Sequence, residues 1–152
     1  MGNSAVRMVA KAQEFNDEIF YYGFDLFEFM TDDYKEHEFH GKSHCDFSTP
    51  SRRLKKTGCK YKLKAGNTRK TLKKFSPDRQ IDFIYIDGAH DYQSVLQDLE
   101  YYLPKVKKNG LMGGHDYNKF YEPYEDVIRA VNQVVGQPNK IFPDTSWLKV
   151  IR

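Results

Sequence analysis

The stretch IDFIYIDGAHDYQSVLQDLEYYLPKVKKNGLMGGHDY, residues 81–117, decides the fold. It opens with the apolar run Ile81–Ile86, which suits a buried strand and ends at Asp87. The segment Tyr92–Leu103 places its apolar side chains on one stripe at helical spacing, which predicts an amphipathic helix. After a glycine turn, a second apolar run ends at His115-Asp116-Tyr117. A strand, a helix and a strand in this order predict two parallel strands with a helix packed over them.

The same alternation continues on both sides of this stretch. The apolar spacing predicts helices at Ser4–Phe15, Thr68–Phe75 and Tyr124–Val135, and strands at Ile19–Phe24, Lys60–Leu63, Lys140–Phe142 and Trp147–Ile151. Residues 29–58 are polar and lack clear periodicity, so we expect an insertion or a lid there, with a helix near Arg52–Thr57. The whole chain, residues 1–152, is therefore expected to be one α/β domain whose parallel sheet is covered on both faces.

The composition favours a globular protein of the cytoplasm. Hydrophobic residues make up 39% and charged residues 30% of the 152 residues. No apolar run approaches the ~20 residues that cross a bilayer, so we expect no membrane partner. The two cysteines are too few for a disulfide framework, which favours free thiols in a reducing compartment.

Positive charge is concentrated in one part of the chain. Residues 47–77 hold 11 Lys or Arg and no Asp or Glu, although the net charge is only +3. A solvated lysine surface is the ordinary interpretation, and attraction of an anionic acceptor is a second. A nucleic-acid-binding module on this face is the alternative function, which we disfavour. Binding of random oligonucleotides with steep salt dependence would support it.

Polar residues close the apolar runs of the predicted sheet. Asp25, Gly66-Asn67, Asp87 and Asp116 each follow one of these runs. Ligands of open α/β sheets bind beyond the carboxyl ends of the strands, so these residues are candidate site residues. Asp25 also lies 23 residues after Gly2, a spacing typical of an acid that binds the ribose of a nucleoside cofactor.

Asp87 and Asp116 end strands that we expect to be adjacent. Two carboxylates held close together repel each other unless a cation or a proton lies between them, and Mg²⁺ is the simplest such cation. His115 would shift the preference toward a softer ion such as Mn²⁺, or would act as a general base without touching metal. The predicted metal ligands are therefore Asp87, His115 and Asp116. His90 is a further candidate base, or caps the helix that follows it.

A second group of potential metal ligands precedes the basic segment. His37, His40, His44 and Cys45 have spacings that suit Zn²⁺. No second ligand cluster supports a structural zinc site, so we favour a polar loop here.

The 81–117 stretch also resembles a known family. An apolar strand, Asp-Gly-x-His-x-Tyr, a helix with a central Asp-Leu, a glycine turn and a strand ending in His-Asp-Tyr resemble class I S-adenosylmethionine-dependent methyltransferases. The closest likeness is to metal-dependent O-methyltransferases of sugars and small molecules. YYGFDLFEF (21–29), KLKAGNTRKTL (62–72) and WLKVIR (147–152) resemble their second, third and last strands. The resemblance implies a Rossmann-like, mostly parallel sheet with a C-terminal antiparallel strand.

The resemblance also implies roles for individual residues. Asp25 would bind the ribose of S-adenosylmethionine, and Asn67 and Thr68 would lie near its adenine. The other implied cofactor contacts are Gly2, Asn3, Ser4, Asp87, Gly88 and His90, and the implied catalytic residues are Asp87, His90 and His115. The acceptor would be a hydroxyl of a sugar or a small polar metabolite, anionic or nucleotide-linked given the basic segment. The sequence leaves assembly into a homo-oligomer open.

The family's first strand has no counterpart in this sequence. No apolar strand precedes Gly2, although that strand is central in the family's sheet. We therefore expect an N-terminally truncated sequence or another segment in the gap, and an inactive fragment with the fold alone is an alternative. A nicotinamide oxidoreductase is a further alternative, but Gly-x-Gly-x-x-Gly is absent.

Overall fold

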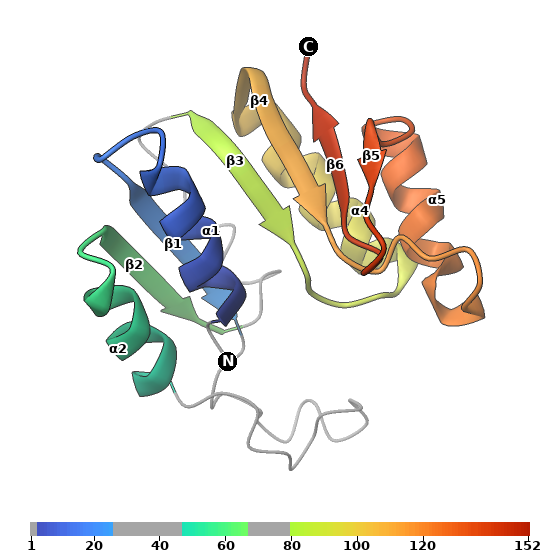
Figure 1. Cartoon of the computed structure of the whole chain (residues 1–152). Coiled ribbons are helices and arrows are strands. Elements are labelled where there is room, and N and C mark those ends of the chain that lie inside the picture. Colours follow the sequence, from blue (N-terminus) through green and yellow to red (C-terminus); the bar gives the residue numbers. More distant parts are fainter. Residues whose placement is uncertain (1–2, 26–46, 67–79) are drawn as a thin grey trace. The chain divides into compact units, whose positions relative to one another are not determined.

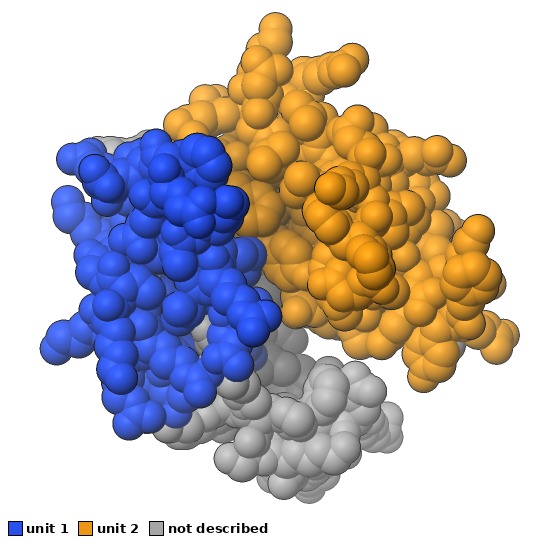
Figure 2. Space-filling model, viewed as in Figure 1, with its two compact units in different colours: residues 1–71 blue, residues 72–152 orange. Residues whose placement is uncertain are grey.

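The computed structural model describes residues 3–25, 47–66 and 80–152. Contacts within the chain divide it into unit 1, Met1–Thr71, and unit 2, Leu72–Arg152 (Figure 2). No helix in the described residues has the length and apolar character needed to cross a bilayer.

Unit 1 is built on two parallel strands covered by two helices (Figure 1). Its elements are α1 (Asn3–Gln13), β1 (Phe20–Asp25), α2 (Ser48–Lys56) and β2 (Lys60–Ala65). The register of the two strands runs from Phe20 opposite Lys60 to Asp25 opposite Ala65. The buried core consists of Ala5, Val9, Leu54 and Cys59. Strands this few are stable only when helices pack on them, which is what α1 and α2 do here.

Unit 2 contains a four-stranded sheet in the order β3-β4-β6-β5 (Figure 1). Its elements are β3 (Ile81–Ile86), α4 (Tyr92–Tyr102), η3 (Leu103–Lys105), β4 (Val106–Gly114), η4 (Glu122–Tyr124), α5 (Glu125–Val134), β5 (Lys140–Ile141) and β6 (Trp147–Val150). β3 and β4 are parallel, whereas β6 runs antiparallel to both β4 and β5. The carboxyl ends of β3 and β4 and the start of β6 therefore meet at one edge of the sheet.

The core of unit 2 lies between the sheet and the helices α4 and α5. Its buried members are Val95, Leu99, Tyr102, Val106, Met112, Val127, Ala130, Val131 and Trp147. Each large apolar side chain in such a core contributes about 1.5–3 kcal/mol of burial free energy. Alternation along β3 sends Ile84 and Ile86 toward this core and Phe83 and Tyr85 to the other face of the sheet.

A glycine on β4 allows the strands to pack closely at the functional edge. A Cβ atom on Gly114 would lie 2.4 Å from the carbonyl oxygen of Ile86 and 2.9 Å from Nε1 of Trp147. Only glycine avoids this collision with a backbone atom. The close approach holds the ends of β3 and β4 against Trp147 at the start of β6.

Most predicted helices and strands are confirmed, with ends shifted by a few residues. The predicted glycine turn before Leu111 is wrong, because β4 already begins at Val106 and passes through Asn109 and Gly110. An irregularity in the β3–β4 register and a left-handed backbone at Asn109, φ 65°, absorb these residues within the strand. The predicted helix at 68–75 and the part of the predicted insertion or lid before residue 47 lie outside the described residues. The single domain, residues 1–152, remains a prediction.

Candidate functional site

Asp87 and His115 lie side by side at the carboxyl end of the parallel pair. The last paired residues of the two strands are Ile86 and Gly114, and the backbone N–H of His115 continues the ladder by donating to the carbonyl of Ile86 over 3.1 Å. The side chains that follow each strand are thereby fixed at the sheet edge, as the sequence predicted for Asp87 and Asp116.

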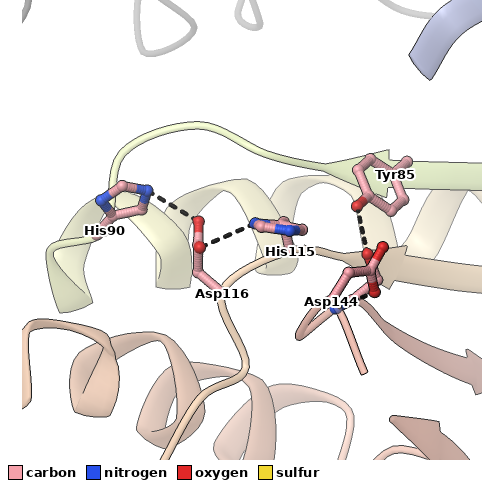
Figure 3. Close-up of polar contacts among 6 residues, drawn as sticks. Tyr85, His90, His115, Asp116 and Asp144 are labelled. Atoms are coloured by element: carbon pink, nitrogen blue, oxygen red, sulfur yellow. Dashed lines mark hydrogen bonds and ion pairs between the residues drawn. The ribbon is translucent and has the colours of Figure 1, made fainter. Parts of the chain in front are cut away.

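Asp116 is held by two imidazoles. Its Oδ1 lies 2.8 Å from Nδ1 of His115, and its Oδ2 lies 3.0 Å from Nε2 of His90 (Figure 3). Asp116 is only 6% exposed, and a buried carboxylate requires hydrogen-bond donors of this kind. Its backbone is left-handed, φ 62°, a conformation that Asp tolerates better than most residues.

The predicted metal ligands are brought together. Asp87, His115 and Asp116 each offer one potential ligand atom, and these atoms lie within 4.8 Å of one another. Two carboxylates and an imidazole are a donor set that divalent ions such as Mn²⁺ accept, and the carboxylates alone suit Mg²⁺. The donor set therefore fits the divalent cation that the sequence analysis predicted.

His90 belongs to the same site, but it does not cap the following helix. The N-cap of α4 is Asp91, whose side chain accepts a hydrogen bond from the backbone N–H of Ser94 over 3.0 Å. The capping alternative for His90 is therefore wrong, because an Asp directly after it is the stronger cap. The His90 ring instead meets the ring of Tyr124 edge-on, with 5.0 Å between their centroids.

A shallow pocket connects these side chains to the core of unit 2. It is lined by the segment from Ile86 to His90, by His115 and Asp116, and by the apolar residues Val95, Leu99, Val127, Val131 and Trp147. The loop has free space at Gly88, because the nearest atom to an added Cβ would be a side-chain oxygen of Asp98 at 3.7 Å. Polar groups over an apolar floor are the usual composition of a small-molecule site.

A polar group that the sequence analysis missed lies beside His115. The hydroxyls of Tyr85 and Ser146 are 2.9 Å apart, and the backbone N–H of Ser146 donates to Oδ1 of Asp144 over 3.1 Å. In Figure 3, His115 lies between Asp116 and this group. Tyr85 precedes Asp87 by two residues, so strand alternation would have placed it on the same face. Nothing local in the sequence points to Ser146.

Burial and nearby acids act together on Tyr85. Burial raises the pKa of its phenol, and the carboxylates of Asp87, Asp144 and Asp116 raise it further, against the opposing hydrogen bond to Ser146. Tyr85 is therefore a neutral hydroxyl at physiological pH, able both to donate and to accept a hydrogen bond.

The predicted cofactor residues of unit 1 are less fully described. Asp25 is exposed at the end of β1, where its carbonyl accepts a hydrogen bond from the N–H of Gly66. Asn3 and Ser4 begin α1, and Oδ1 of Asn3 accepts a hydrogen bond from Arg53 over 2.6 Å. Gly2, Asn67, Thr68 and the His37–Cys45 group lie outside the described residues.

Comparison with a curated relative gives a partial match. Uncharacterized protein R132 of Acanthamoeba polyphaga mimivirus is 32% identical over 103 residues, which cover 59% of this chain. The match takes in 46% of that relative, so this chain spans less than half of its length.

Several solved structures share the fold. The O-methyltransferase from Bacillus cereus in complex with SAH has a TM-score of 0.57 at 9% identity, covering 99% of this chain and 81% of that one. The O-methyltransferase NovP has a TM-score of 0.60 at 16% identity, covering 97% and 66%. The SAH-bound methyltransferase PaMTH1 of Podospora anserina has a TM-score of 0.54 at 12% identity, covering 96% and 77%.

A family model joins the fold to the sequence. The model for a methyltransferase domain matches residues 1–117, a range that contains Asp25, Asp87, His90, His115 and Asp116. The Rossmann-like fold that the sequence predicted is confirmed by the α/β architecture and by the structures above. The chain belongs to the methyltransferase domain family and has the fold of the class I S-adenosylmethionine-dependent O-methyltransferases.

Proposed function

We propose that this chain transfers the methyl group of S-adenosylmethionine to a hydroxyl of a small, polar, sugar-like acceptor, with the help of a divalent cation. The observation that carries the proposal is the clustering of Asp87, His115 and Asp116, whose potential ligand atoms lie within 4.8 Å of one another at the carboxyl end of β3 and β4. Family membership supplies the methyl donor, and the polar cluster supports a hydroxyl as the acceptor.

The reaction requires two changes at the acceptor oxygen. A bond forms between this oxygen and the methyl carbon, the bond between that carbon and sulfur breaks, and its electron pair stays on sulfur. The acceptor hydroxyl also loses its proton to a base. Alignment of oxygen, carbon and sulfur supplies much of the rate, which favours side chains fixed on strand ends over mobile ones.

A cation held by Asp87, His115 and Asp116 would favour the ionised acceptor hydroxyl and would offset the repulsion between the two carboxylates. His90 is then the proton acceptor in our proposal, because it lines the same pocket and contacts Asp116. The carboxylate of Asp116 would stabilise the imidazolium formed when His90 takes the proton.

His115 supports a second arrangement without a cation. Its Nδ1 faces Oδ1 of Asp116, so in the neutral imidazole the lone pair lies on Nε2 and can accept a proton directly. The two arrangements make different predictions, since only the first loses activity on removal of divalent ions.

Each unit contains candidate cofactor residues. Asp25 is our proposed ribose ligand, because a carboxylate accepts two hydrogen bonds at once from vicinal hydroxyls. Gly88, at the start of the pocket loop, would allow the backbone to approach the cofactor closely.

The test measures the binding of S-adenosylhomocysteine by titration calorimetry, then methyl transfer from radiolabelled S-adenosylmethionine with and without EDTA. We expect binding, and a turnover that EDTA abolishes and Mg²⁺ or Mn²⁺ restores. Turnover that resists EDTA would assign His115 as the base and would refute the cation. Absence of S-adenosylhomocysteine binding to a correctly folded chain would refute the proposed function.

A further inference from the structure

We propose that Tyr85, Ser146 and Asp144 form a subsite that holds a second hydroxyl of the acceptor, so that the enzyme selects neutral, polyhydroxylated rings. This inference rests on the proposed function, in which a first acceptor hydroxyl lies at Asp87 and His115. It adds the substrate class and the residues that select it.

The topology brings this group to the reacting edge of the sheet. β6 is antiparallel to β4, and its first residue, Trp147, pairs with Gly114. Ser146 is therefore carried to the end of β4, where His115 follows. Tyr85 reaches the same place from β3, and its hydroxyl lies 2.9 Å from that of Ser146 (Figure 3).

The turn that carries Asp144 and Ser146 is fixed by its own backbone bonds. Phe142 donates to the carbonyl of Ser146 over 2.8 Å, and Thr145 donates to the carbonyl of Phe142 over 3.0 Å. Tyr117, directly after Asp116, donates to the carbonyl of Thr145 over 3.1 Å and ties the turn to the metal-ligand segment. A fixed turn favours binding, because a mobile turn would have to be ordered by the ligand, and the entropy lost would reduce the affinity.

Two residues with strained backbones lie at the hydrogen bond between Tyr117 and Thr145. Asp116 and Thr145 are both non-glycine residues with left-handed backbones, at φ 62° and φ 67°. For Thr, which is β-branched, this conformation is costly and persists only where the surrounding structure imposes it. Strain of this kind concentrates at functional sites.

The chemistry of the group selects a neutral hydroxyl over an anion. The hydroxyls of Tyr85 and Ser146 can each donate a hydrogen bond to an alcohol or accept one from it. The carboxylate of Asp144 can only accept, and would take a hydrogen bond from the alcohol's O–H group. The carboxylate of Asp144 lies next to Ser146, whose backbone N–H donates to it over 3.1 Å, so a phosphate at this group would be repelled. The subsite thus favours a neutral sugar over the anionic acceptor that the basic segment suggested.

An exposed aromatic ring lies on the same face of the strand. Phe83 is 41% exposed, and its ring centroid is 6.4 Å from that of Tyr85. An exposed ring beside hydroxyl groups suits a saturated ring that carries C–H bonds on one face and hydroxyls at its rim.

The experiment compares myo-inositol with cyclohexanol, which has the same carbon ring and one hydroxyl. Ligand-observed NMR titration measures both affinities on the full chain, with and without S-adenosylhomocysteine. We expect Tyr85→Phe and Ser146→Ala each to weaken inositol binding by about fivefold, the effect of one lost hydrogen bond, and to leave cyclohexanol unchanged. Tyr101→Phe, on α4 and away from this group, is the matched control and should change neither.

The outcomes separate this inference from the proposed function. Unchanged inositol binding in both variants, equal weakening of both ligands, or no inositol binding to a chain that binds S-adenosylhomocysteine would overturn the subsite alone. Failure to bind S-adenosylhomocysteine, with inositol binding still weakened by Tyr85→Phe, would overturn the methyl-transfer proposal and leave a polyol-binding site.

Discussion

Both units pack helices against a pair of parallel strands, but they differ in how many side chains they bury. In the described residues, the core of unit 1 has four buried side chains, whereas that of unit 2 has nine, including Met112 and Trp147. The clustered acids and histidines are on unit 2, and the proposed ribose ligand Asp25 is on unit 1. Under the proposed function, the reacting groups lie on the unit with the larger core, and the ribose ligand lies on the unit with the smaller one.

The sharpest test of this division replaces one acid in each unit. Asp116→Asn should reduce methyl transfer by about 10²–10³-fold, because it removes the charge that holds two imidazoles, with little change in cofactor affinity. Asp25→Asn should weaken S-adenosylhomocysteine binding and leave turnover at saturating cofactor nearly intact. Asp82→Asn, an exposed acid on β3, is the control. Kinetics and calorimetry together check the pair, and an Asp25→Asn enzyme that binds normally would break the division.

The next largest effect concerns the two cores. Leu54 in unit 1 and Leu99 in unit 2 are both 0% exposed, so they form a matched pair. Each Leu→Ala change should cost about 2–5 kcal/mol of the free energy of unfolding. Hydrogen exchange should show lost protection confined to unit 1 for Leu54→Ala and spread through unit 2 for Leu99→Ala. Equal loss throughout the chain in both variants would show that the units unfold as one.

A third test applies to the close strand contact in unit 2. Gly114→Ala should destabilise the protein by about 1–3 kcal/mol, because the new methyl group would meet the Ile86 carbonyl oxygen at 2.4 Å. Gly88→Ala is the control, since its nearest neighbour lies 3.7 Å away. Urea unfolding followed by circular dichroism measures both. A stable Gly114→Ala variant would mean that the strand ends can separate without cost.

The smallest effect is on alkaline stability. Burial raises the pKa of Tyr102 in unit 2 and of Tyr21 in unit 1 above the usual 10, aided by Asp98 and Asp25 respectively. The native state keeps these protons to a higher pH than the unfolded state does. Their contribution to the free energy of unfolding is therefore fully present below pH 10 and is lost as the pH rises through the folded pKa. For Tyr102 the slope should reach at most about 1.4 kcal/mol per pH unit. Urea unfolding between pH 9 and 11 should show a shallower loss in Tyr102→Phe, and an unchanged slope would contradict the assignment.

The sequence predicted what depends on one strand–helix–strand unit. The β3–α4–β4 order and the grouping of Asp87, His115 and Asp116 follow from local periodicity and from parallel pairing, and no distant contact is needed. The sequence also allows Asp91 to be predicted as the cap of α4, because Asp is a stronger cap than His.

The rest depended on contacts between distant segments. Asn109 and Gly110 have the composition of a turn, yet hydrogen bonds with Ile151 hold them within the strand region. Ser146 meets Tyr85 only because β6 enters the sheet antiparallel to β4, and the spacing of 61 residues carries no trace of this contact. Register and strand direction are tertiary properties that a single sequence leaves open.

The outer strand β5 has a consequence for handling the protein. It is two residues long, begins with Lys140, and is followed closely by Pro143. An edge this short, with a charge at one end and a residue that lacks an N–H just beyond the other, offers almost no template for another chain to pair with. Concentrated samples should therefore resist sheet-to-sheet aggregation along this side of unit 2.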